Sequence, residues 1–252
     1  MNAVSKTMIA ASIAAASLFS GAASAAPYQQ FTINPNGGDN TFVADRMVGG
    51  YEEQITFNGD NTFDVSLRVE IGQFFRGSQF LFPTVTGLGT DYALYATYNA
   101  TGTVSTAGAA TKFTFTPGTG SFSLFKDYLN SDLADVELAN GVGVKGSGTL
   151  DPTLDTCGES NGINCGSFGS TTTFNLTDAG RAFFVAPNPF YNISFQSGQL
   201  NDFEPSGSQT IYGSLDIVFQ EAGEVPEPAS VALLGLGMLG LYGARRRSKK
   251  AA

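Results

Sequence analysis

The sequence contains no histidine and no tryptophan. Without histidine, the chain cannot build Ser-His-Asp or Cys-His catalytic sites or a zinc site with imidazole ligands, and it lacks the most common general base. Without tryptophan, it also lacks the largest aromatic side chain that could form a platform in a sugar-processing cleft. The missing histidine excludes these histidine-dependent sites, and the missing tryptophan weakens the case for a sugar-processing cleft, although tyrosine could substitute.

Catalysis by two carboxylates is the route that remains chemically open. A glycosidase needs only two Asp or Glu side chains about 5 to 9.5 Å apart. The candidates are Glu52 with Glu53, and the group Asp132, Asp135 and Glu137. Adjacent strand residues point to opposite faces, so Glu52 and Glu53 should not converge on one substrate. We therefore expect no catalytic residues.

Positive charge is scarce in the central part of the chain. Residues 26–224 hold 21 acidic side chains and only 7 Lys or Arg, an excess of 14 negative charges. Nucleic acid is therefore not an expected partner, because binding to it relies on cationic contacts with phosphates. An anionic polymer would be repelled unless divalent cations bridged the like charges. This charge suits a soluble surface or matrix protein.

The N-terminus has the pattern of a secretory signal peptide. Lys6 precedes an apolar stretch of small residues at 8–19, and Ala23-Ser24-Ala25 fits a small-x-small cleavage site. Cleavage after Ala25 leaves Ala26 as the new N-terminus, whereas cleavage after Ala26 would place a proline next to the scissile bond. The alternative, an N-terminal membrane helix, is disfavoured by the short apolar core. We predict a signal peptide at 1–25 and an exported body at 26–224.

The C-terminal region also lacks a long hydrophobic run. Residues 229–244 are 16 uncharged residues, interrupted by four glycines. As a helix they would span about 24 Å, which is less than the roughly 30 Å hydrocarbon core of a bilayer. A basic cluster follows, consisting of Arg245, Arg246, Arg247, Lys249 and Lys250. This cluster should remain in the cytoplasm, so the body is expected beyond the inner membrane.

The tripeptide Pro226-Glu227-Pro228 stands directly before that apolar segment. Its prolines exclude it from a helix interior and keep the chain extended. Residues 225–252 as a whole resemble the PEP-CTERM sorting signal of exported proteins from Gram-negative bacteria. The resemblance implies processing by an exosortase and transient residence in the inner membrane. An ordinary single-span tail anchor is the alternative.

The chain has only two cysteines, Cys157 and Cys165. In an exported protein, two cysteines this close usually form a disulfide. Such a bond would close a nine-residue loop and stabilise the fold by about 2 to 3 kcal/mol in the chain-entropy model. A metal-binding or redox role is the alternative. Without histidine, however, two cysteines cannot complete a zinc site, and their spacing is not that of a Cys-x-x-Cys motif.

Calcium is the only metal worth considering, and no other cofactor is expected. Asp151, Asp155 and Glu159 lie at intervals of four around the cysteine loop, and Asp127, Asp132 and Asp135 lie nearby in the sequence. Carboxylate oxygens of this kind can bind Ca²⁺, but the EF-hand pattern is missing. A solvated acidic loop is the favoured interpretation.

The body has the pattern of an all-β protein. Apolar and polar residues alternate plainly through 63–71, and shorter runs at 113–115 and 122–124 repeat the pattern around a Pro-Gly turn. Further strands are predicted at 41–47, 51–57, 92–104, 136–138, 172–176, 191–195 and 211–219, and a single helical turn at 178–184 capped by Thr177 or Asp178. About 200 residues suffice for one domain with a core. We predict a single β-sandwich or jelly-roll-like domain.

Three segments of the body resemble the flocculation-associated family of PEP-CTERM proteins, at 42–57, 189–195 and 211–219. The resemblance implies a role in holding cells to extracellular polysaccharide, and it brings no catalytic residue. We therefore expect a cell-surface or matrix protein that promotes flocculation or biofilm through extracellular polysaccharide. A secreted polysaccharide-active enzyme using paired carboxylates is the alternative.

Overall fold

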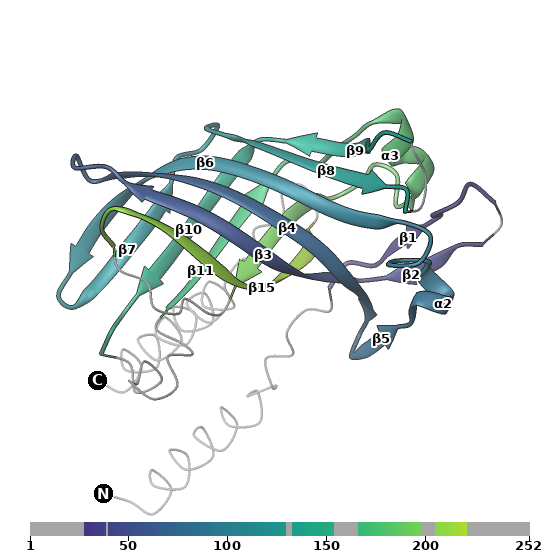
Figure 1. Ribbon diagram of the computed structural model, residues 1–252, viewed down its shortest axis with the longest axis horizontal. Coiled ribbons are helices and arrows are strands. Elements are labelled where there is room, and N and C mark those ends of the chain that lie inside the picture. Colours follow the sequence, from purple (N-terminus) through teal and green to yellow (C-terminus); the bar gives the residue numbers. More distant parts are fainter. Residues whose placement is uncertain (1–27, 39, 130–132, 154–165, 198–204, 221–252) are drawn as a thin grey trace, which may run out of the picture.

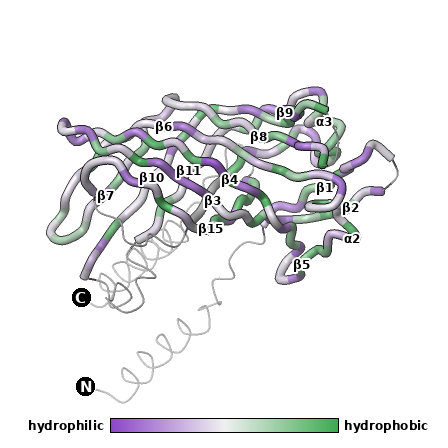
Figure 2. Tube along the Cα trace, viewed as in Figure 1, coloured by the Kyte–Doolittle hydropathy of each residue, from purple (hydrophilic) through white to green (hydrophobic). Residues whose placement is uncertain are grey.

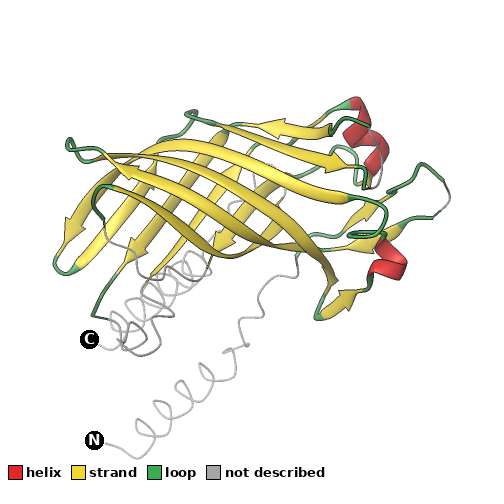
Figure 3. Cartoon of the chain, viewed as in Figure 1, coloured by secondary structure: helices red, strands yellow, loops and turns green. Residues whose placement is uncertain are grey.

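The computed structural model describes residues 28–38, 40–129, 133–153, 166–197 and 205–220. Strands dominate these residues, and the two described helices lie towards the same end of the molecule (Figure 3). The strands are β1 (Phe31–Ile33), β2 (Phe42–Ala44), β3 (Arg46–Phe57), β4 (Thr62–Arg76), β5 (Gln79–Leu81), β6 (Ala93–Ala107), β7 (Ala110–Phe115), β8 (Ser121–Asp127), β9 (Val136–Gly141), β10 (Gly143–Leu150), β11 (Gly166–Thr172), β12 (Asn175–Leu176), β13 (Phe184–Ala186), β14 (Asn192–Ser197) and β15 (Ser208–Gln220). The helices are α2 (Pro83–Thr86) and α3 (Asp178–Phe183). The predicted all-β class is confirmed.

The alternation seen in the sequence produces strands with one buried and one exposed face. In β4, Val65, Leu67, Val69 and Ile71 are buried, and every residue between them is exposed. Hydrophobic and hydrophilic positions accordingly alternate along the long strands in Figure 2. Strand β4 extends the predicted 63–71 by Thr62 at one end and by residues 72–76 at the other, where its last three residues pair with β5.

The predicted boundary between 41–47 and 51–57 is wrong. The interruption between strands falls at Asp45 instead. Strand β3 then runs continuously through Gly49 and Gly50. These glycines suggest a turn, but Gly49 lies at a register shift, where an added Cβ would come within 2.6 Å of the Glu70 carbonyl oxygen. Strand β10 and most of β11 were not predicted, because their glycines obscure the apolar alternation.

One antiparallel sheet of twelve strands forms the body, in the order β12-β9-β8-β6-β7-β10-β11-β14-β15-β3-β4-β5. Strand β6 also pairs with β4, so the path from β4 through β6, β7, β10, β11, β14, β15 and β3 returns to β4 (Figure 1). The opposite edge of β6 is shared, since Ala93 pairs with Asp127 of β8 and Gly102 pairs with Phe115 of β7. The large sheet thus closes on itself, and its opposite walls face each other across the interior, where the sequence predicted two separate packed sheets.

Side chains from opposite walls meet in the interior. The ring of Tyr51 on β3 packs edge-on against Phe168 on β11, with 5.8 Å between the centroids. The hydroxyl groups of Tyr98 on β6 and Ser170 on β11 lie 2.9 Å apart and are hydrogen-bonded. These pairs join strands that are not neighbours in the sheet, so the space between the walls is a packed core.

A second aromatic cluster fills one end of the domain, where the small sheet β13-β1-β2 joins the large one. Phe219 lies 4.7 Å from Phe31 and 5.2 Å from Phe174 between ring centroids. Helix α3 packs beside this cluster, and its N-cap is Thr177, whose Oγ1 accepts a hydrogen bond from the Gly180 amide. Thr177 is therefore the cap, of the two residues that the sequence offered.

Within the described ranges, neither helix has the length and apolar character needed to cross a bilayer. The predicted signal peptide at 1–25 and the predicted sorting segment at 225–252 lie outside those ranges.

Candidate ligand-binding groove

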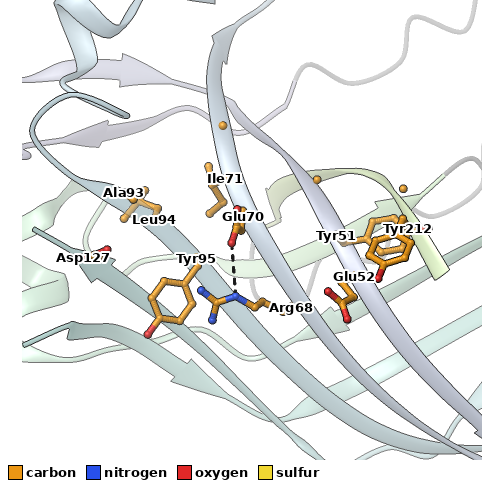
Figure 4. Close-up of a pocket in the computed structure, with 13 residues that line it drawn as sticks. Tyr51, Glu52, Arg68, Glu70, Ile71, Ala93, Leu94, Tyr95, Asp127 and Tyr212 are labelled. Carbon is orange, nitrogen blue, oxygen red and sulfur yellow. Dashed lines mark ion pairs between the residues drawn. The ribbon is translucent and has the colours of Figure 1, made fainter. Parts of the chain in front are cut away.

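A groove of about 750 Å³ lies on the outer face of the sheet, across β15, β3, β4 and β6 (Figure 4). Its lining comprises Gly50, Tyr51, Glu52, Arg68, Glu70, Ile71, Gly72, Ala93, Leu94, Tyr95, Asp127, Tyr212 and Gly213. Gly50 and Gly72 are exposed and contribute no side chain. The bare backbone at these two positions therefore forms part of the groove floor.

Arg68 lies at the centre of the groove. Its Nε is 3.7 Å from Oε1 of Glu70, and its guanidinium carbon is 4.1 Å from the centroid of the Tyr95 ring (Figure 4). Both members of the ion pair are more than half exposed, so the pair adds little to stability. The ion pair instead helps to hold the Arg68 guanidinium over the Tyr95 ring, with polar atoms of Arg68 and Glu70 still open to a ligand.

Tyr95 is fixed from three sides. Its ring stacks on Phe125 at 5.0 Å, Arg68 covers it, and its hydroxyl donates a 2.6 Å hydrogen bond to Oδ2 of Asp135. Desolvation raises the pKa of Tyr95, and the hydrogen bond and charge of Asp135 raise it further, while Arg68 opposes both effects. The phenol therefore remains a neutral hydrogen-bonding group at physiological pH.

Tyr212 on β15 lies on the opposite side of the groove, beside Glu52 (Figure 4). The Tyr212 side chain is 67% exposed, which is the highest value among the large hydrophobic residues described. The groove thus offers a free aromatic ring, an arginine and carboxylates on rigid strands. This combination can pack against the apolar faces of a sugar and hydrogen-bond to its hydroxyl groups.

The predicted carboxylate candidates are dispersed. Glu52 faces the groove while Glu53 is buried on the other face of β3, as their adjacency predicted. Asp135 holds Tyr95, and Glu137 accepts a 2.8 Å hydrogen bond from the Ser123 hydroxyl. Asp132 lies outside the described residues.

Glu53 is an isolated acid in the interior. It is 4% exposed, and its Oε2 has no hydrogen-bond partner among the residues that the structure describes. Burial raises the pKa of Glu53 to about 7. The sequence pattern of β3 indicates this buried position, because Glu53 lies on the same face of the strand as Tyr51 and Ile55.

A second cavity, of about 320 Å³, lies beside Lys126 at the end closed by α3. The Lys126 ammonium donates a 2.6 Å hydrogen bond to the Pro35 carbonyl, and it lies 4.3 Å from the Tyr128 ring centroid and 5.0 Å from that of Tyr92. Burial lowers the pKa of Lys126, and the charge of Asp91 partly opposes this shift. Lys126 was not predicted as a site, although it follows the buried Phe122 and Leu124 at intervals of two, which signals an inward position.

The calcium and disulfide predictions fall largely outside the described residues. Asp151 is described, and its Oδ1 accepts hydrogen bonds from the amide and hydroxyl of Thr153. Asp155, Glu159, Cys157 and Cys165 are not described. No group of three or more His, Cys, Asp or Glu side chains suited to a metal occurs in the part of the chain that the structure describes. The Ca²⁺ site and the disulfide both stay predictions.

The sequence did not single out Arg68, Glu70, Tyr95 or Tyr212 as a site, and it offered Asp127 only among the calcium candidates. They come from β4, β6, β8 and β15, and only the strand pairing makes them neighbours. The sequence could show only that these residues face outward on their strands. Which outward residues become neighbours depends on the register in which the strands pair.

Comparison with known proteins identifies the C-terminal signal. The PEP-CTERM protein-sorting motif matches residues 224–247, which include Pro226-Glu227-Pro228, the apolar segment and Arg245 to Arg247. Neither the curated proteins nor the solved structures contain a match to the chain. The resemblance of the body to a flocculation-associated family therefore has no support from relatives. The motif shows that the chain is an exported protein, processed at the membrane and sorted by an exosortase.

Proposed function

We propose that this protein is a non-catalytic surface or matrix protein that binds extracellular polysaccharide through the outer groove and so promotes flocculation or biofilm. The observation that carries the proposal is the exposed Tyr212 facing the fixed Arg68–Tyr95 pair across a groove of about 750 Å³. An exosortase-sorted protein works beyond the membrane, where polysaccharide is an abundant polymer.

Charge narrows the class of polysaccharide. Arg68 is the one cation among the lining residues, beside Glu52, Glu70 and Asp127. A neutral glycan meets hydroxyl-binding groups without repulsion. An anionic glycan would need Ca²⁺ to bridge like charges, for which the acidic loops around Asp132, Asp135, Asp155 and Glu159 are the candidate carriers.

A polysaccharide-active enzyme is the second candidate, and one observation favours it. Glu52 pairs with Arg68 across β3 and β4, so Glu70 is its diagonal neighbour in the same groove. The backbone positions of diagonal neighbours are about 7 to 8 Å apart, so their carboxyl groups can reach the separation of about 5 to 9.5 Å that glycosidases use. However, Glu70 is 77% exposed and ion-paired with Arg68, whereas a general acid needs burial to stay protonated.

Binding to washed exopolysaccharide from the native host tests the proposal. Tyr212→Ala and Arg68→Gln should each lower affinity about tenfold, the effect of losing one aromatic or charged contact of about 1.4 kcal/mol. Lys112→Ala is the matched control, because Lys112 is an exposed cation on β7 outside the groove. Equal binding by wild type and all three variants would contradict the proposal that polysaccharide binds in the groove.

Two further measurements separate adhesion from catalysis. Deleting the gene should leave polysaccharide synthesis intact but let the cells disperse. Purified protein that shortens the polysaccharide, and that loses this activity in Glu70→Gln, would move the protein to the enzyme class.

A further inference from the structure

One end of the domain carries exposed apolar side chains. Phe82 is 61% exposed, Val85 in α2 is 60% exposed, and Tyr28 is 42% exposed. Large apolar side chains that gather on one exposed surface often mark an interaction site. Phe82 is the N-cap of α2 and Val85 lies in α2, which follows β5 at the end of the sheet where β3 begins and β4 ends (Figure 1).

Side-chain contacts connect Tyr28 to Phe82, and Val85 follows Phe82 by three residues in α2. The Arg46 guanidinium lies 5.6 Å from the Tyr28 ring centroid and 4.7 Å from that of Phe75. Phe80 then lies 5.9 Å from Phe75 and 5.0 Å from Phe82. We call this surface the end patch, and define it as Tyr28, Arg46, Phe75, Phe80, Phe82 and Val85.

The end patch includes one cation, Arg46. Arg76 adds a second, exposed cation beside Phe75. Of the carboxylates nearby, Asp216 pairs with Arg46 at 3.4 Å and Asp45 is only 6% exposed, while Asp91 stays exposed beside Gly87 at the end of α2. Aromatic rings combined with arginine are typical of protein surfaces at the lipid–water interface.

The chain leaves the domain at this same end. Val218 pairs with Arg46, Arg46 with Phe75, and Phe75 with Phe80, so the end of β15 and the patch lie on four adjacent strands. At a strand spacing of about 4.8 Å, Val218 is about 14 Å from Phe80 across the sheet. The last described residue, Gln220, therefore lies close to the end patch.

The tether to the sorting motif is short. Residues 221–225 separate Gln220 from Pro226, and even a fully extended chain spans only about 20 Å over that interval. The matched sorting segment begins at residue 224. While this segment is in the membrane, the end patch cannot lie far from the lipid surface.

We propose that the end patch docks on the lipid–water interface of the membrane that holds the C-terminal segment, before the exosortase acts. Phe82 and Val85 enter the interface, and Arg46 and Arg76 lie at the level of the phosphates. The docked body presents the Pro226-Glu227-Pro228 segment at the membrane surface, and the outer groove stays open along the side of the domain. This inference does not depend on the proposed function.

The absence of tryptophan gives a direct test. The full chain carrying Phe82→Trp is reconstituted into vesicles of phosphatidylethanolamine and phosphatidylglycerol, with or without brominated acyl chains. Docking predicts a blue-shifted emission that loses most of its intensity in the brominated vesicles. Ala109→Trp is the matched control, because Ala109 is exposed in the β6–β7 hairpin at the opposite end of β6, and the emission of this variant should be unquenched.

Val85→Trp provides a second reporter if Phe82→Trp disturbs folding. Equal quenching in the Phe82→Trp and Ala109→Trp proteins would overturn the proposal, because it indicates non-specific adsorption. Blue-shifted but unquenched emission from Phe82→Trp would also overturn it, since protein rather than lipid would then cover the patch. Red-shifted, unquenched emission from the same variant would show that the patch stays in water.

Discussion

Glu52 and Glu53 are adjacent in the sequence but lie in opposite environments. Glu52 faces the open groove, whereas Glu53 is 4% exposed inside the sheet, and its Oε2 has no hydrogen-bond partner within the described ranges. The two carboxylates cannot act on one substrate. One is available for ligand binding, and the other affects stability through its protonation.

Glu53 should make the fold less stable as pH rises. Its pKa is ordinarily 4.5 and burial raises it to about 7 in the folded protein, so both states are protonated below pH 4.5. Between pH 4.5 and 7, Glu53 loses its proton in the unfolded chain but keeps it in the folded protein, so the free energy of unfolding falls as pH rises. Above pH 7 this loss of stability reaches about 3 kcal/mol. Urea unfolding of Glu53→Gln should show a stability advantage over wild type that grows between pH 5 and pH 8. Glu52→Gln is the control, and the same pH trend in both variants would contradict this assignment.

Gly213 should resist substitution for a steric reason. A Cβ at this position would lie 2.6 Å from the Tyr51 hydroxyl and 2.7 Å from two ring carbons. Overpacking of this kind costs about 1 to 3 kcal/mol. Gly213→Ala should lower the unfolding free energy by that amount in urea titration. Gly72→Ala tests the explanation, since a Cβ there meets no described atom within 4 Å and should leave stability almost unchanged.

Glu227 should be needed for sorting. It lies in the Pro-Glu-Pro tripeptide of the matched motif. Glu227→Ala should accumulate as an uncleaved form in the inner membrane, and immunoblotting of envelope and medium fractions from a native host would show its size and location. Glu221→Ala is a nearby acidic control outside the matched motif. Release of Glu227→Ala at normal size would rule the prediction out.

Cys157 and Cys165 should be joined in the mature protein. Their separation and the exported setting make a disulfide the favoured state. Alkylation without reduction, followed by mass spectrometry, should leave both thiols unmodified, and prior reduction should expose both. Modification of both residues in the non-reduced protein would refute the pairing. The intact mass would also report cleavage at the predicted Ala25–Ala26 bond.

Local pattern was enough to predict the strand class, since residues 63–71 alternate and β4 follows them. It was also enough to identify the sorting motif, because Pro226-Glu227-Pro228, a short apolar segment and a basic cluster are contiguous in the chain. Such properties depend on neighbouring residues alone. The absence of histidine likewise excludes whole classes of catalytic site without any structure.

The tertiary structure alone decided how the sheet closes and which side chains meet. Tyr212 lies opposite Glu52, and Glu70 opposite Tyr95, because β15 pairs with β3 and β4 with β6 over long stretches of sequence. A shift of one residue in either register would turn every side chain of that strand to the other face. The groove, the buried Glu53 and the end patch beside β15 therefore depend on long-range hydrogen bonding, which local alternation does not specify.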